Sequence, residues 1–242
     1  MSRFNDFRLG FKDGAPIGFG YLTVSFAFGI LASQKGLSIF QAVLMSATNL
    51  TSAGQFAALD IIHSNLSYYE LALTQFILNL RYFLMSCALS QKLDPETNLK
   101  HRLTASFGIT DEIFAINASK PGKVSAYYTY GAMSIAIPGW TLGTFLGAFS
   151  DNLMSESLKS ALGVAIFGMF IAILIPPAKQ DKSILAVVLS AAFLAWLFKE
   201  APLLSQISSG FGIIIITIVV SAAAAYLSTK TNSRERREHA TG

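Results

Sequence analysis

The sequence predicts an all-α protein, a polytopic membrane bundle of about seven transmembrane helices with broken or re-entrant segments. Of its 242 residues, 52% are hydrophobic and 13% are charged, with a mean hydropathy of +0.51, whereas soluble domains carry roughly a quarter charged residues. The apolar residues fall into runs close to the ~20 residues that a helix needs to cross a bilayer. This composition excludes an ordinary soluble enzyme and leaves no room for a second globular domain.

The chain reads as one membrane domain with polar ends. A polar segment at 1–15 precedes the membrane bundle at 16–228, and a polar tail follows at 229–242. The basic residues lie at the termini and in short loops, which is typical of headgroup contact, so we expect no nucleic-acid partner. The lone Cys87 excludes an intrachain disulfide and a thiolate metal cluster, and we expect no metal and no cofactor.

The apolar runs give the order of the spans. The expected spans are 16–33, 39–62, 68–89, 127–149, 158–175, 184–198 and 203–227. Pro138 predicts a kink in the fourth of them. A shorter stretch at 103–118 carries charge at its middle, and it is predicted to be re-entrant, interfacial or buried against the bundle.

Polar side chains cluster inside the second run, between Thr48 and Asp60. They are Asn49, Ser52 and Gln55, with Gly54 among them. Each could simply pack helices together, because small and amide residues do so in membranes. Together they favour a substrate site at a helix break, since discontinuous helices commonly bind substrate at the bilayer midplane.

Charged residues at membrane depth mark two further candidates. Arg81 lies inside the third run with Asn79 two residues before it. An intramembrane charge is costly and is a functional candidate by default, although Arg81 could also snorkel to the interface. Asp111 and Glu112 lie in the stretch at 103–118, and they either solvate a loop or serve as a proton or substrate-ammonium site.

Glycine–aromatic pairs recur along the chain. Gly20-Tyr21, Gly29 and Gly54-x-Phe56 are echoed by Gly139-Trp140, Gly147 and Gly168-x-Phe170. Three spans, a basic connection and three further spans would place two copies in opposite orientation, as in an inverted repeat. A crossing or hairpin within 103–118 would put both termini in the cytoplasm by the positive-inside rule.

Four motifs occur in order within a resemblance that covers about residues 8–228. They are Gly10-Phe11-Lys12-Asp13-Gly14-Ala15-Pro16-Ile17, Ser52-Ala53-Gly54-Gln55-Phe56-Ala57-Ala58-Leu59, Asn79-Leu80-Arg81-Tyr82-Phe83-Leu84-Met85-Ser86 and Thr110-Asp111-Glu112-Ile113-Phe114-Ala115. With these motifs the chain resembles the AzlC family of bacterial branched-chain amino acid permeases. The resemblance implies a multi-pass inner-membrane exporter of amino acids such as valine, working with a small membrane subunit of the AzlD type.

The resemblance also supports functional roles for six residues inside the motifs. These residues are Gly54, Gln55, Asn79, Arg81, Asp111 and Glu112. The chain differs from the family pattern at Asn49 and Thr51-Ser52, where small apolar residues are common, so the identity of the substrate is open.

The mechanistic hypothesis is secondary transport of an amino acid zwitterion without catalysis. Arg81 and N–H groups near Gly54 would bind the carboxylate, Asp111 or Glu112 would accept the ammonium group or a coupling proton, and Asn79 and Gln55 would orient the ligand. Phe56 and nearby aliphatic residues would favour branched side chains. Three alternatives are the permease subunit of an ATP-driven transporter, a receptor or structural subunit, and a membrane enzyme. The chain lacks a nucleotide-binding Gly-x-x-x-x-Gly-Lys-[Ser/Thr] motif, and its three histidines do not cluster.

Overall fold

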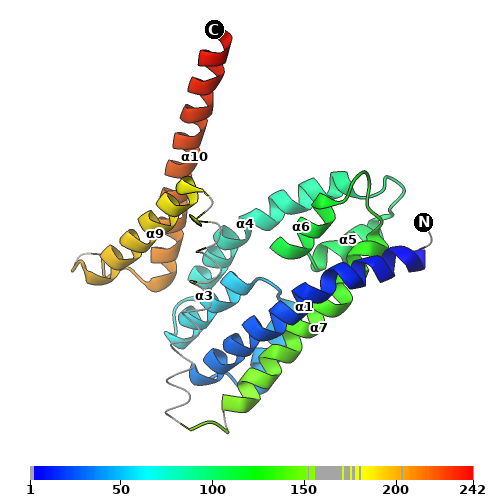
Figure 1. The fold of residues 1–242 in the computed structure, drawn as a ribbon. Coiled ribbons are helices and arrows are strands. Elements are labelled where there is room, and N and C mark those ends of the chain that lie inside the picture. The colour runs from blue at the N-terminus through cyan, green and yellow to red at the C-terminus, as the bar shows by residue number, and fades with distance from the viewer. Residues whose placement is uncertain are drawn as a thin grey trace. The chain divides into compact units, whose positions relative to one another are not determined.

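The computed structural model describes residues 3–151, 153–155, 171, 175, 178–179, 181–202 and 204–241. Within these ranges the chain is helical, which confirms the predicted all-α class. The helices are α1 (Arg3–Gln34), α2 (Ile39–Thr48), α3 (Ser52–His63), α4 (Tyr68–Lys92), α5 (Leu99–Phe107), α6 (Asp111–Ser119), α7 (Ala126–Asp151), α9 (Lys182–Glu200) and α10 (Ser209–Thr241) (Figure 1). Five of the described helices are long and apolar enough to cross a membrane, namely α1, α4, α7, α9 and the Ser209–Leu227 part of α10. The span expected at 158–175 lies almost entirely outside the described residues.

The chain forms two compact units. One comprises Met1–Leu59 and Asn79–Ile166, and the other Asp60–Leu78 and Phe167–Gly242. In the second unit α9 packs against α10. The buried carboxylate of Glu70 accepts bonds from the Ser208 hydroxyl and the Phe211 N–H, and so caps the start of α10.

Helices α1 and α7 form the frame of the first unit. They lie side by side and run in the same direction, because Gly14 of α1 meets Ala132, and Gly29 further along meets Thr144 and Ala148 (Figure 1). A Cβ atom at Gly14 would lie 2.7 Å from the Ala132 Cα. Small residues on both helices thus let the two backbones approach closely, which is the usual basis of helix association in membranes.

Helices α2 and α3 form a re-entrant hairpin and not the single span expected at 39–62. Helix α2 begins at the C-terminal end of the α1–α7 pair, where Ala42 packs with Phe28. The chain then reaches the middle of the pair, where Leu50 packs against the cluster of Tyr21 and Trp140. Helix α3 returns, since Leu59 joins the same cluster as Ala42.

The reversal has local causes in the sequence. The Ser38 hydroxyl accepts the Gln41 N–H and starts α2 with a capping box. At the tip, the Asn49 carbonyl oxygen Oδ1 accepts the Thr51 N–H at 3.2 Å, and the Thr51 hydroxyl accepts the Gly54 N–H at 3.4 Å. Such side-chain bonds compete with a continuous helix. The predicted break is therefore confirmed, and it lies at Asn49–Thr51, just ahead of Gly54.

Helices α5 and α6 form a second hairpin that enters from the opposite end. The His101 Nδ1 lies 2.8 Å from the Tyr130 hydroxyl, near the start of α7. Gly108 then reaches Met133, and α6 turns back until the Thr129 hydroxyl donates to Asn117 Oδ1 at 2.8 Å. Residues 103–118 therefore lie in a helical hairpin that folds back on itself, with Ile113 and Asn117 of α6 fully buried.

Helix α4 connects the two hairpins and runs opposite to α1. Its Asn79 lies beside Thr51 at the tip of the first hairpin, and just after its end Leu93 pairs with Val124 ahead of α7. Thus α1–α2–α3 and α4–α5–α6 are each a long helix followed by a re-entrant hairpin, in opposite orientations and about 60 residues apart.

This arrangement corrects the repeat expected from the glycine echoes. Tyr21 and Trp140 pack edge-on at 5.3 Å, and Gly29 and Gly147 both lie in the contact between α1 and α7, whereas Gly20 has nothing within 4 Å. Helices α1 and α7 run in the same direction, so the copies that these echoes pair are not inverted. The echo at Gly168-x-Phe170 lies outside the described residues. The inverted relation lies instead between residues 3–63 and 68–119.

Candidate functional site

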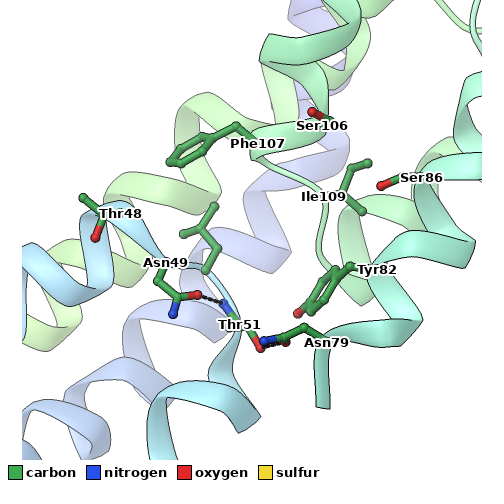
Figure 2. Close-up of a pocket in the computed structure, with 10 residues that line it drawn as sticks. Thr48, Asn49, Thr51, Asn79, Tyr82, Ser86, Ser106, Phe107 and Ile109 are labelled. Atoms are coloured by element: carbon green, nitrogen blue, oxygen red, sulfur yellow. Dashed lines mark hydrogen bonds between the residues drawn. The ribbon is translucent and has the colours of Figure 1, made fainter. Parts of the chain in front are cut away.

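A pocket of about 220 Å³ lies between the tips of the two hairpins and the side of α4 (Figure 2). Its lining residues are Thr48, Asn49, Leu50, Thr51, Asn79, Tyr82, Ser86, Ser106, Phe107 and Ile109. Figure 2 shows the polar groups of Asn49, Thr51 and Asn79 gathered on one side, with Phe107 and Ile109 on another. The pocket is therefore amphipathic, and it is formed where the chain is irregular.

The side chain of Thr51 makes two hydrogen bonds on the polar side of the pocket. Its hydroxyl donates to Asn79 Oδ1 at 2.6 Å while accepting the N–H of Gly54. One side chain thus joins the break of the first hairpin to α4. A helix begins directly beside it, so the first N–H groups of α3 and their partial positive charge lie close to the pocket.

Thr110 has the equivalent position in the second hairpin. It is buried, and its hydroxyl accepts the Ile113 N–H at 3.3 Å. Helix α6 therefore also begins at a threonine cap in the middle of the unit, and its first turn carries Asp111 and Glu112. Acidic residues are favourable at such a helix start.

An ion pair lies next to the pocket. Arg81 Nη1 is 2.7 Å from Asp111 Oδ2, and the two side chains remain 42% and 50% exposed. The Arg81 guanidinium also lies over the Tyr82 ring, at 5.1 Å from its centroid. Because the pair is half exposed at the level of the hairpin tips, it cannot face lipid cheaply and needs water or protein beside it.

A buried hydrogen-bond network supports the pocket from behind. Trp140 Nε1 donates to Gln55 Oε1 at 2.8 Å, and Gln55 Nε2 donates to the Ser46 hydroxyl at 3.1 Å. Ser46 and Thr144 share a further bond of 2.7 Å. On the other hairpin, Tyr21 donates to Glu112. The network fixes the first hairpin to α7, and the Tyr21 bond fixes the second to α1.

The structure distributes the predicted site residues over three environments. Asn49 and Asn79 line the pocket. Arg81 and Asp111 form the adjacent ion pair, and Glu112 bonds to Tyr21.

The other predicted residues, including Phe56, lie outside the pocket lining. Gln55 is fully buried in the network, with both amide atoms bonded. Ser52 and Gly54 form the first turn of α3. Phe56 packs edge-on against Phe28 at 5.4 Å and belongs to that apolar cluster.

Sequence reasoning did not assign several residues that build the site. Tyr82 lines the pocket three positions after Asn79, and this spacing puts both on one helix face. Phe107 and Ile109 form the apolar side of the pocket. The sequence did not show that the chain folds back between α5 and α6, so these two residues could not be assigned to a pocket.

A family model described as "AzlC protein" matches residues 16–154. The chain belongs to the AzlC family. This AzlC chain is 27% identical over 185 residues to "Inner membrane protein YgaZ" of Escherichia coli (strain K12), covering 74% of the chain and 76% of that protein. It is 30% identical over 181 residues to an "Uncharacterized membrane protein" of Archaeoglobus fulgidus, covering 74% and 79%. Another such protein, of Helicobacter pylori (strain J99), is 28% identical over 177 residues, covering 67% and 76%. No solved structure matches. Together with its apolar helices, family membership makes this a multi-pass membrane protein and suggests a role in membrane transport.

Proposed function

We propose that this chain is the large subunit of a secondary transporter that exports branched-chain amino acids. The pocket between the hairpin tips is the observation that carries the proposal. It is smaller than the roughly 300–1,000 Å³ of pockets for drug-sized ligands, which suits a small metabolite.

The polarity of the pocket fits an amino acid with an apolar side chain. Thr51, Asn79 and Asn49 offer hydroxyl and amide groups to a polar head, and Leu50, Phe107 and Ile109 offer an apolar surface. The apolar surface takes the role that sequence reasoning gave to Phe56.

The ion pair fits the two charges of a zwitterion. In this structure Arg81 and Asp111 neutralise one another. A zwitterion carries the same two charges, so its carboxylate can bind Arg81 while its ammonium group binds Asp111 or Glu112. The exchange leaves neither Arg81 nor Asp111 unpaired at membrane depth, which keeps the cost of binding low. The starts of α3 and α6 add a positive potential for the carboxylate.

A small membrane subunit of the AzlD type and an inner-membrane location complete the proposal. A partner would cover polar surface that cannot face lipid, such as the half-exposed Arg81–Asp111 pair. The location rests on likeness to the Escherichia coli protein named for the inner membrane.

Counterflow of labelled valine, leucine, isoleucine and methionine into proteoliposomes tests the function, with and without a co-expressed small subunit. We expect saturable exchange, and we expect at least a tenfold loss in Arg81→Ala and in Asp111→Asn because each leaves one charge of the site unpaired. Arg102→Ala is the matched control, since Arg102 bonds to Ser90 and to loop carbonyls away from the pocket. Absence of exchange from folded protein with its partner, or exchange that requires ATP, would refute secondary transport of these amino acids.

A further inference from the structure

We propose that Asp13, Lys120 and Tyr128 form a latch that keeps the α5–α6 hairpin closed over one end of the pocket, and that this latch opens during transport. The inference rests on the proposed transport function but not on the identity of the substrate. It gives a role to Asp13, which lies in the motif at Gly10–Ile17 and has no part in the pocket.

The α5–α6 hairpin separates the pocket from the N-terminal end of the α1–α7 pair. Ser106, Phe107 and Ile109 at its tip line the pocket. Its base lies at the start of α7, where His101 meets Tyr130. In the proposed transport cycle a solute that moves between the pocket and that end passes this hairpin, which then has to shift.

The latch residues come from three elements and meet at the base of the hairpin. Lys120 Nζ at the end of α6 lies 2.7 Å from Asp13 Oδ2 of α1. The Tyr128 hydroxyl of α7 donates to the same Asp13 oxygen at 2.8 Å. The Lys120 ammonium also lies 5.0 Å from the centroid of the Tyr128 ring, and Lys92 at the end of α4 donates to the Lys120 carbonyl. One lysine thus ties α6 to α1, α4 and α7.

The two hairpins are anchored differently. The first is held by Ser46 and Gln55, which are fully buried and bonded to α7. The second has one buried polar bond to α7, between Asn117 and Thr129; its bonds from Glu112 to Tyr21 and from His101 to Tyr130 are partly buried, and its ion pairs are partly exposed. Partly exposed pairs contribute little to stability, so the second hairpin is the less firmly anchored of the two.

Helix α6 links the latch to the pocket. It is a single nine-residue helix with an ion pair at each end, Arg81–Asp111 at the pocket and Asp13–Lys120 at the base. A zwitterion that displaces Asp111 from Arg81 removes one of the contacts of this helix, and the Tyr21–Glu112 bond, the buried Ile113, the Asn117–Thr129 bond and the latch still hold it. Substrate binding and opening are coupled through that helix.

Thiol labelling of the pocket tests the latch without measuring transport. In a Cys87→Ser background, Ser106→Cys places a reporter at the hairpin tip. A membrane-impermeant maleimide is added from each face of oriented proteoliposomes. We expect labelling to become about two- to five-fold faster from one face only in Asp13→Asn and in Lys120→Gln, the factor given by the loss of one partly exposed ion pair. The reversed pair, Asp13→Lys with Lys120→Asp, should restore the parent rate, and Asp6→Asn on the same helix should leave the rate unchanged.

Unchanged labelling from both faces in both single variants, with protein that elutes as folded, would overturn the latch. Faster labelling from both faces alike would also overturn it, because that indicates a loosened fold. One-sided acceleration with rescue by the reversed pair supports the latch even if valine is not transported, in which case only the proposed substrate fails.

Discussion

Replacing Gln55 by leucine tests whether the buried network holds the first hairpin in place. Gln55 is fully buried and Trp140 is 2% exposed. Leucine fills a similar volume but leaves the Trp140 indole N–H without an acceptor, while Ser46 keeps its bond to Thr144. An average interhelical hydrogen bond in a membrane protein contributes about 0.6 kcal/mol in double-mutant cycles. A buried donor left without an acceptor costs more, about 1–3 kcal/mol, and this larger cost applies here because the indole N–H stays buried. We therefore expect Gln55→Leu to lower the free energy of unfolding by about 1–3 kcal/mol.

The assay is reversible unfolding in mixed micelles for the parent, Gln55→Leu, Trp140→Phe and the double variant. Trp140→Phe removes the donor, so in the double variant neither partner is left unsatisfied. The double variant should then be more stable than the sum of the two single costs predicts, by about 1 kcal/mol. Gln91→Leu, at an exposed position, is the matched control. Additive costs, or a Gln55→Leu protein as stable as the parent, would refute the network as the anchor.

Three further predictions concern other parts of the chain. Gly18→Leu should prevent α1 and α7 from packing together, because a Cβ atom at position 18 would lie 2.9 Å from the Ile135 carbonyl oxygen; we expect no folded protein on size exclusion. Gly20→Leu should fold normally, because a Cβ atom at position 20 would meet no packing partner within 4 Å. Glu70→Ala should destabilise the start of α10 by about 1 kcal/mol, as loss of a helix cap does, and thermal unfolding in detergent with Glu70→Gln as the conservative comparison checks this. Phe107→Ala should enlarge the apolar side and shift the ratio of methionine to valine exchange by about tenfold; an unchanged ratio would place the substrate elsewhere.

Composition was enough to predict the class, and the polar residues around Gly54 predicted a break, which the structure has at Asn49–Thr51 and not at Ser52–Gly54. Apolar runs of span length predict helices, and Asn49 and Thr51 carry the side-chain chemistry that ends α2 and starts α3. Intramembrane charge also made Arg81 a candidate, and the motif at Thr110–Ala115 made Asp111 one; the two form the ion pair beside the pocket.

The path of the chain could not be predicted from hydropathy. A 24-residue apolar run has the length of a crossing whether it continues or folds back, and only the packing of Leu59 beside Ala42 shows that it returns. For the same reason Gln55 could not be assigned to the interior of the hairpin, since its neighbour Trp140 lies 85 positions away in the sequence. The division of the chain into a single membrane domain remains a prediction.

The glycine seam between α1 and α7 has a consequence for how the protein is made. Helix α1 leaves the ribosome well before its close-packed partner α7, which begins roughly 90 residues later; this is about 5–20 s of synthesis at the usual rate of roughly 5–20 residues per second. During that interval the glycine face of α1 has no helix to receive it, and both hairpins must enter the membrane beside it. We expect newly made α1 to remain bound at the insertion machinery until α7 emerges, so truncation of the nascent chain before Ala126 should leave α1 crosslinked there.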